Sequence, residues 1–169
     1  GQIVEKVMPS FDRCLAAAKD EKAFTRCADK LLAIAASEIA AEAIRTDPRL
    51  AQHIPNLKIG KTVAGVIYLE HPAVTQASLG CSSRNRSNDV FASTDKKKPT
   101  DAYYDFIGTA AALVFTIPKP DAVKGTKRCV SRTNIVRGYN IDSRYRKLDI
   151  HCTVAKTGVR ITVSREKGV

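Results

Sequence analysis

Residues 129–152 form the stretch CVSRTNIVRGYNIDSRYRKLDIHC, which begins and ends in cysteine and has turn-forming residues near its midpoint. A turn between Asn140 and Ile141 would place Cys129 opposite Cys152 on neighbouring antiparallel strands. The alternation of apolar and polar residues on both sides of that turn is typical of strands. The stretch therefore predicts a β-hairpin closed by a disulfide.

In this register the two faces of the hairpin differ in chemistry, because alternate residues of a strand point to opposite faces. Arg132 lies opposite Asp149, and Asn134 lies opposite Lys147, on the charged face. Arginine suits phosphate and carboxylate groups because its planar fork makes two hydrogen bonds at once. The candidate binding surface on this basic sheet face consists of Arg128, Arg132, Arg137, Arg144, Lys147 and Arg160. A solvated face with ordinary cross-strand ion pairs is the alternative interpretation.

The N-terminal cysteines repeat this symmetry in a helical context. Cys14 and Cys27 are almost equidistant from the polar break at residues 19–21. A single helix would separate them by roughly 20 Å, whereas an αα-hairpin brings them within disulfide reach. We therefore predict two disulfides, Cys14–Cys27 and Cys129–Cys152, with buried free thiols as the alternative.

These disulfides predict an oxidising compartment, so we expect a periplasmic or secreted protein whose signal peptide has been removed. The sequence holds no closely spaced Cys/His ligand set, and we expect neither a metal nor another cofactor. No apolar run approaches the roughly 20 residues that span a bilayer. The longest, residues 107–117, is too short.

The positive charge is concentrated in one half of the chain. Residues 1–80 hold 10 basic and 9 acidic side chains, whereas residues 81–169 hold 18 and 8, which accounts for the net charge of +11. Such a surplus favours an anionic partner, an acidic protein or an anionic polymer. Nucleic acid is compatible with the charge, but no RNA- or DNA-binding motif supports it.

The element pattern predicts a single α+β domain over residues 1–169. A helical hairpin fills residues 1–54, and its second helix is expected to bury a stripe that contains Leu32 and Ile39. Residues 55–169 are expected to form a sheet of about five antiparallel strands, covered by one further helix that Thr100 caps. The element order is αα-ββ-α-βββ, with a second turn of the final meander at residues 156–158 and an exposed loop at residues 84–100 that contains Lys96, Lys97 and Lys98. The order resembles that of PAS-like and profilin-like domains, without a shared motif.

Two residues are candidates for catalysis. His151 adjoins Arg132 and Lys147 in the predicted hairpin and could act as a general acid or base in phosphodiester cleavage. Cys81 could be a nucleophile, an attachment point or a packed thiol. Neither residue belongs to a recognisable catalytic motif.

Three functional hypotheses follow. The first is a non-enzymatic, exported binding domain, of an inhibitor, immunity, sensor or envelope accessory type, that engages an acidic macromolecule through its basic face. The second is a secreted nuclease-like hydrolase that uses His151. The third is a structural subunit of an envelope assembly. Whether the chain is an enzyme stays open from the sequence alone.

Overall fold

The computed structural model describes residues 12–45, 48–81, 88–135 and 140–165. A short helix at residues 12–17 precedes two further N-terminal helices, a four-stranded segment, two more helices and three final strands. The elements are α2 (Glu21–Arg45), α3 (Pro48–His53), β1 (Lys58–Val63), β2 (Val66–Glu70), β3 (Gln76–Cys81), β4 (Asn88–Thr94), α4 (Asp101–Phe115), α5 (Lys119–Ile135), β5 (Asn140–Tyr145), β6 (Leu148–Ala155) and β7 (Gly158–Arg165). The predicted α+β class is confirmed.

All seven strands join one antiparallel sheet in the order β1-β2-β3-β4-β7-β6-β5. The expected number was about five. One unexpected strand arises because Ala64 and Gly65, both with positive φ, make a tight turn inside a segment that was expected to be a single strand. A second is β4, whose residues were assigned to the exposed loop at 84–100. A third arises because residues 143–155, expected to be one strand, turn at Arg146 and Lys147 between β5 and β6, while the strand expected around Cys129 is part of helix α5. Val90 and Ala92 of β4 are buried in the core, so among the described residues of this segment only those after Thr94 match the loop prediction.

The expected hairpin across residues 129–152 is wrong, although its disulfide is confirmed. Residues 119–135 form helix α5, and the bridge joins Cys129 of α5 to Cys152 of β6 with a Cα–Cα distance of 6.1 Å. Asn140 is not at a turn but pairs with Thr153 in the sheet. The turn of this hairpin lies at Arg146 and Lys147, both of which have positive φ. The second predicted turn, at residues 156–158, is confirmed between β6 and β7.

The β-branched residues of α5 explain why a strand was expected there. Thr126 and Thr133 favour strands by propensity, but each is buried and donates its hydroxyl to a carbonyl oxygen four residues earlier, that of Ala122 and Cys129 respectively. These bonds satisfy the hydroxyls inside the helix. Gly125 allows close packing, because a Cβ at this position would lie only 2.8 Å from Cδ1 of Ile150.

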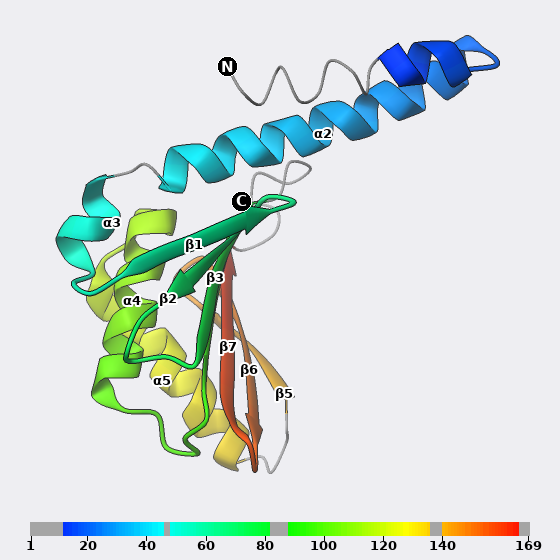
Figure 1. Ribbon diagram of the computed structural model, residues 1–169. Coiled ribbons are helices and arrows are strands. Elements are labelled where there is room, and N and C mark those ends of the chain that lie inside the picture. Colours follow the sequence, from blue (N-terminus) through cyan, green and yellow to red (C-terminus); the bar gives the residue numbers. More distant parts are fainter. Residues whose placement is uncertain (1–11, 46–47, 82–87, 136–139, 166–169) are drawn as a thin grey trace.

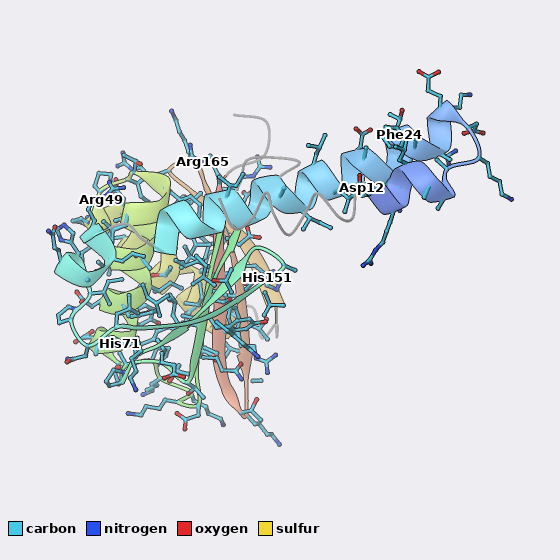
Figure 2. All side chains as sticks on the ribbon, turned by 45° about the horizontal axis from the view of Figure 1, so that its top comes forward. Asp12, Phe24, Arg49, His71, His151 and Arg165 are labelled. Carbon is cyan, nitrogen blue, oxygen red and sulfur yellow. A yellow bond between two sulfur atoms is a disulfide. The ribbon has the colours of Figure 1, made fainter. Side chains whose placement is uncertain are left out.

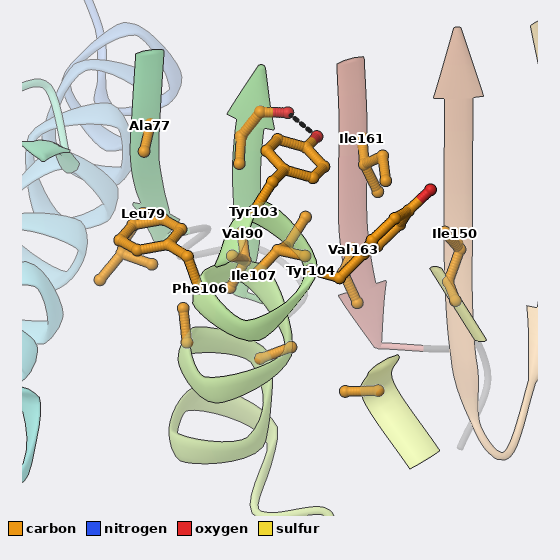
Figure 3. Packing of buried hydrophobic residues seen from close by; sticks show 14 of the residues in the cluster. Ala77, Leu79, Val90, Tyr103, Tyr104, Phe106, Ile107, Ile150, Ile161 and Val163 are labelled. Atoms are coloured by element: carbon orange, nitrogen blue, oxygen red, sulfur yellow. Dashed lines mark hydrogen bonds between the residues drawn. The ribbon is translucent and has the colours of Figure 1, made fainter. Parts of the chain in front are cut away.

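Helices α4 and α5 pack side by side on one face of the sheet (Figure 1). Thr100 caps α4 as predicted, because its hydroxyl accepts a hydrogen bond from the Tyr103 N–H at 3.2 Å. The helix continues to Phe115. Figure 3 shows Tyr103, Phe106 and Ile107 of α4 above apolar side chains from β3, β4 and β7. This layer between helices and sheet is the core.

Two tyrosines of α4 are held in this core. Tyr103 is fully buried and donates its hydroxyl to the carbonyl oxygen of Ala92 at 2.7 Å (Figure 3). Burial, with a smaller contribution from the neighbouring Tyr104, raises the pKa of Tyr103 far above its usual range. Burial likewise raises the pKa of Tyr104 to about 12, with a smaller contribution from the Asp101 carboxylate.

The N-terminal helical pair is confirmed, with a disulfide between Cys14 and Cys27 at a Cα–Cα distance of 5.8 Å. Helix α2 crosses one end of the sheet near β2 and β3, and its N-terminal half extends beyond the sheet together with residues 12–17 (Figure 1). The expected buried stripe is therefore incomplete: Leu32 is 56% exposed and Ile39 is 55% exposed.

Candidate functional site: the basic stripe of helix α5

The open face of the sheet, opposite α4 and α5, is not the basic surface that the sequence suggested. Val159, Ile161 and Val163 of β7 point into the core, so the alternate residues Arg160, Thr162 and Ser164 point to the open face. Apart from Phe91, the register places only small or polar residues beside them on β3, β4 and β6: Gln76, Ser78, Gly80, Asp89, Ser93, Asp149, His151 and Thr153. Cations and carboxylates are therefore mixed on this face.

The predicted binding residues fall on three separate parts of the molecule. Arg144 and Arg160 lie on the open face, and Arg144 pairs with Asp149 through Nε and Oδ1 at 3.4 Å. Lys147 lies in the turn between β5 and β6. Arg128 and Arg132 lie on α5. The expected pair of Arg132 with Asp149 is thus replaced by Arg144 with Asp149, and Arg137 lies outside the described residues.

The exposed side of α5 carries the most regular cluster of cations. Lys124, Arg128 and Arg132 follow one another at intervals of four residues, and all three are exposed. Residues spaced by four share a helix face, with a rise of about 6 Å between them. We call these three residues the basic stripe. Sequence reasoning missed Lys124 because the segment was interpreted as a strand that begins after Gly125.

The opposite side of α5 fixes this helix to the sheet. Ala122, Gly125, Thr126, Cys129, Val130 and Thr133 are buried at the three-and-four spacing of an amphipathic helix. The Cys129–Cys152 bridge adds a covalent link to β6, which lies next to the edge strand β5. The basic stripe is consequently displayed on a helix whose other side is both packed and cross-linked.

Neighbouring lysines of α5 differ from the stripe because they have acidic partners. Lys119 pairs with Asp105. Lys127 contacts Asp101 at 3.5 Å, and its ammonium lies 5.4 Å from the ring centroid of Tyr104. Within the described part of the chain, none of the ion pairs includes a residue of the basic stripe. These three cations are therefore available to a partner.

The hydrolase constellation is not assembled. His151 lies on the open face of β6, whereas Arg132 projects from α5 on the other side of the sheet. In the sheet, His151 pairs with Thr162 of β7 and Asp142 of β5. Cys81 is the last residue of β3, and its side chain lies outside the described residues. The structure therefore does not bring His151, Arg132 and Lys147 onto one surface.

The side chain of a second histidine, His71, connects two loops. It lies far from His151 (Figure 2) and lines a cavity of about 190 Å³ together with His53 and Asp105. Its Nε2 is 2.8 Å from the carbonyl oxygen of Pro55, and its Nδ1 accepts the backbone N–H of Ala73 at 3.1 Å. Both ring nitrogens thus have backbone partners, which is typical of a histidine that fixes two loops.

The portions of the chain that the structure describes contain no group of three or more His, Cys, Asp or Glu side chains able to hold a metal ion. No described helix is long and apolar enough to cross a membrane. Comparison of the chain with protein-family models, curated proteins and solved structures finds no match.

Proposed function

We propose that this chain is a non-enzymatic, exported binding domain that engages an acidic macromolecule through the basic stripe of α5. The observation that carries the proposal is the regular array of Lys124, Arg128 and Arg132 on the exposed side of one helix. The proposal retains the acidic partner expected from the net charge of +11, but moves the contact from the sheet to the helix.

Two features of α5 suit it to this role. A helix that is packed and cross-linked on its inner side loses little conformational freedom when a partner binds to its outer side. Cations that take part in no ion pair attract an anionic partner more strongly than cations that are already paired. The two disulfides support an oxidising compartment such as the periplasm or the extracellular space.

The proposal is tested by charge reversal on the stripe. The affinities of the wild type for heparin and for poly-L-glutamate, one acidic polymer of each kind, are measured against those of a triple variant (Lys124→Glu, Arg128→Glu and Arg132→Glu). We expect at least a tenfold loss, about 1.4 kcal/mol, and a wild-type affinity that falls as salt rises.

The polar loop provides a matched control. Reversal of Lys96, Lys97 and Lys98 to Glu makes the same change in net charge, from +11 to +5, at exposed positions outside α5. We expect this variant to lose less than threefold. Equal losses in the two triple variants would contradict the proposal, because net charge rather than the stripe would then govern binding. Since Glu is unfavourable in the last turn of a helix, a triple Gln variant of the stripe checks that the loss is not caused by unfolding.

A further inference from the structure

A polar cavity on the open face lies away from the basic stripe, on the other side of the sheet. It has a volume of about 350 Å³, within the range of small-ligand sites. The cavity forms where the turn between β6 and β7 meets the end of β4 and the beginning of β3. Its lining is rich in hydroxyl groups and includes one cation and one carboxylate: Thr75, Gln76, Ser93, Thr94, Asp95, Thr153, Thr157 and Arg160.

The rim of the cavity is held by close contacts between neighbouring segments. Gly158 has φ of +126° and approaches β4 so closely that a Cβ would lie 1.9 Å from the carbonyl oxygen of Thr94. Thr75 donates its backbone N–H to the carbonyl oxygen of Ser93 at 2.8 Å. The Thr75 hydroxyl accepts the Asp95 N–H at 3.2 Å. Backbone and hydroxyl contacts at the ends of β3, β4 and β7 therefore fix the rim before any ligand arrives.

Arg160 is central to the row of polar residues that crosses this cavity. The register pairs it with Ser93 of β4 on one side and Thr153 of β6 on the other, and Gln76 of β3 follows Ser93. Cross-strand neighbours have Cβ atoms about 5 Å apart, so these polar groups can reach one ligand. Arg160 and Asp95 both line the cavity, yet no ion pair within 4.0 Å joins these two described residues.

The threonine hydroxyls of the cavity can donate hydrogen bonds to a ligand. A threonine hydroxyl that accepts a hydrogen bond keeps its own O–H as a donor. Thr75 is in this state because it accepts from Asp95. The guanidinium of Arg160 supplies a planar fork that matches a carboxylate or a phosphate. Asp95 can accept hydrogen bonds only, which suits the hydroxyl groups of a ligand at the other end of the cavity.

From this arrangement we infer that the cavity around Arg160 binds a small molecule that combines an anionic group with hydroxyl groups, as in a sugar acid or a sugar phosphate. The anionic group contacts Arg160, while hydroxyl groups contact Asp95 and the threonines. This site is separate from the basic stripe, because the sheet lies between them. The two proposals can therefore fail independently.

The test is a titration of the intact chain followed by amide chemical shifts. Glucuronate and glucose 6-phosphate are the two probes, which separate carboxylate from phosphate recognition, and neutral glucose is the control. We expect saturable shifts at Thr75, Ser93, Asp95 and Thr157 with at least one anionic probe below about 10 mM, and no such shifts with glucose. Arg160→Gln should weaken this binding at least tenfold.

A matched variant on the same face makes the result specific. Arg144→Gln removes an exposed arginine that pairs with Asp149 and does not line the cavity, so it should change the affinity by less than twofold. The inference is overturned if neither anionic probe shifts the cavity amides, if the shifts persist in Arg160→Gln, or if the probes shift only residues 124–132 of α5.

Discussion

The two disulfides should differ sharply in what they contribute to the stability of the sheet. The Cys129–Cys152 bridge closes a sequence separation of 23 residues, for which chain-entropy arguments give a stabilisation of about 3.4 kcal/mol. The Cys14–Cys27 bridge closes 13 residues, and the same argument gives about 2.9 kcal/mol. Loop length alone therefore predicts nearly equal effects.

Their positions predict otherwise. Cys129 and Cys152 are fully buried between α5 and β6, so loss of their bridge loosens one of the two helices that cover the core. The Cys14–Cys27 bridge joins helices that extend beyond the sheet (Figure 1), so its loss frees the N-terminal helical hairpin without opening the core. Cys129→Ala with Cys152→Ala should lower the melting temperature of the sheet by about 7–14 °C. Cys14→Ala with Cys27→Ala should lower it by about 2 °C or less.

The assay needs one signal from the core and one from the helices. The chain contains no tryptophan, and near-ultraviolet circular dichroism of the buried tyrosines reports on the core, whereas the signal at 222 nm includes the helical hairpin. We expect the hairpin variant to lose helical signal early while its core transition stays in place. Equal shifts of the core transition in the two double variants would refute this reasoning.

Three further outcomes are expected. Because burial raises the pKa values of Tyr103 and Tyr104, their contribution to stability is complete below pH 10 and is lost as pH rises toward 12 and beyond. The phenolate absorbance of these two tyrosines should therefore appear only with alkaline unfolding. Their ionisation in the folded state near pH 10 would contradict burial. Gly158→Ala should cost at least ~2 kcal/mol in urea unfolding, because it places a Cβ against a β4 carbonyl at positive φ, whereas Gly80→Ala, with its nearest contact at 3.6 Å, should cost under about 1 kcal/mol. His71→Ala should lower the free energy of unfolding by about 2 kcal/mol through loss of two hydrogen bonds to backbone groups, and an unchanged value would show that these bonds contribute nothing.

The sequence predicted which cysteines pair better than it predicted the secondary structure between them. Equidistant spacing about a polar break was sufficient to pair Cys14 with Cys27. The symmetry of residues 129–152 also paired Cys129 with Cys152 correctly, although the hairpin from which that pairing was inferred is wrong. That constraint does not specify whether the chain between two cysteines is strand or helix. Thr126 and Thr133 then favoured a strand by propensity, whereas tertiary packing against β6 selects the helix.

Turn chemistry accounts for the other differences. The turn at Arg146 and Lys147 has positive φ at two residues that seldom adopt it, so no local signal distinguished it from the more conventional turn at Asn140. Misplacing that turn also misplaced the cations, because a strand and a helix project the same residues to different surfaces. The regular spacing of Lys124, Arg128 and Arg132 could have been found by testing the helical period on the same segment.

The assignment of the binding surface to the basic stripe is tested most directly by chemical-shift mapping on the unmodified chain. Amide chemical shifts are recorded while a heparin oligosaccharide and, separately, a short poly-L-glutamate are titrated into the protein. We predict that the largest shifts fall on residues 124–132 of α5 and diminish as salt is added. Shifts centred instead on Lys96, Lys97 and Lys98, or on the open face around His151 and Thr162, would contradict the assignment of the binding surface to the basic stripe.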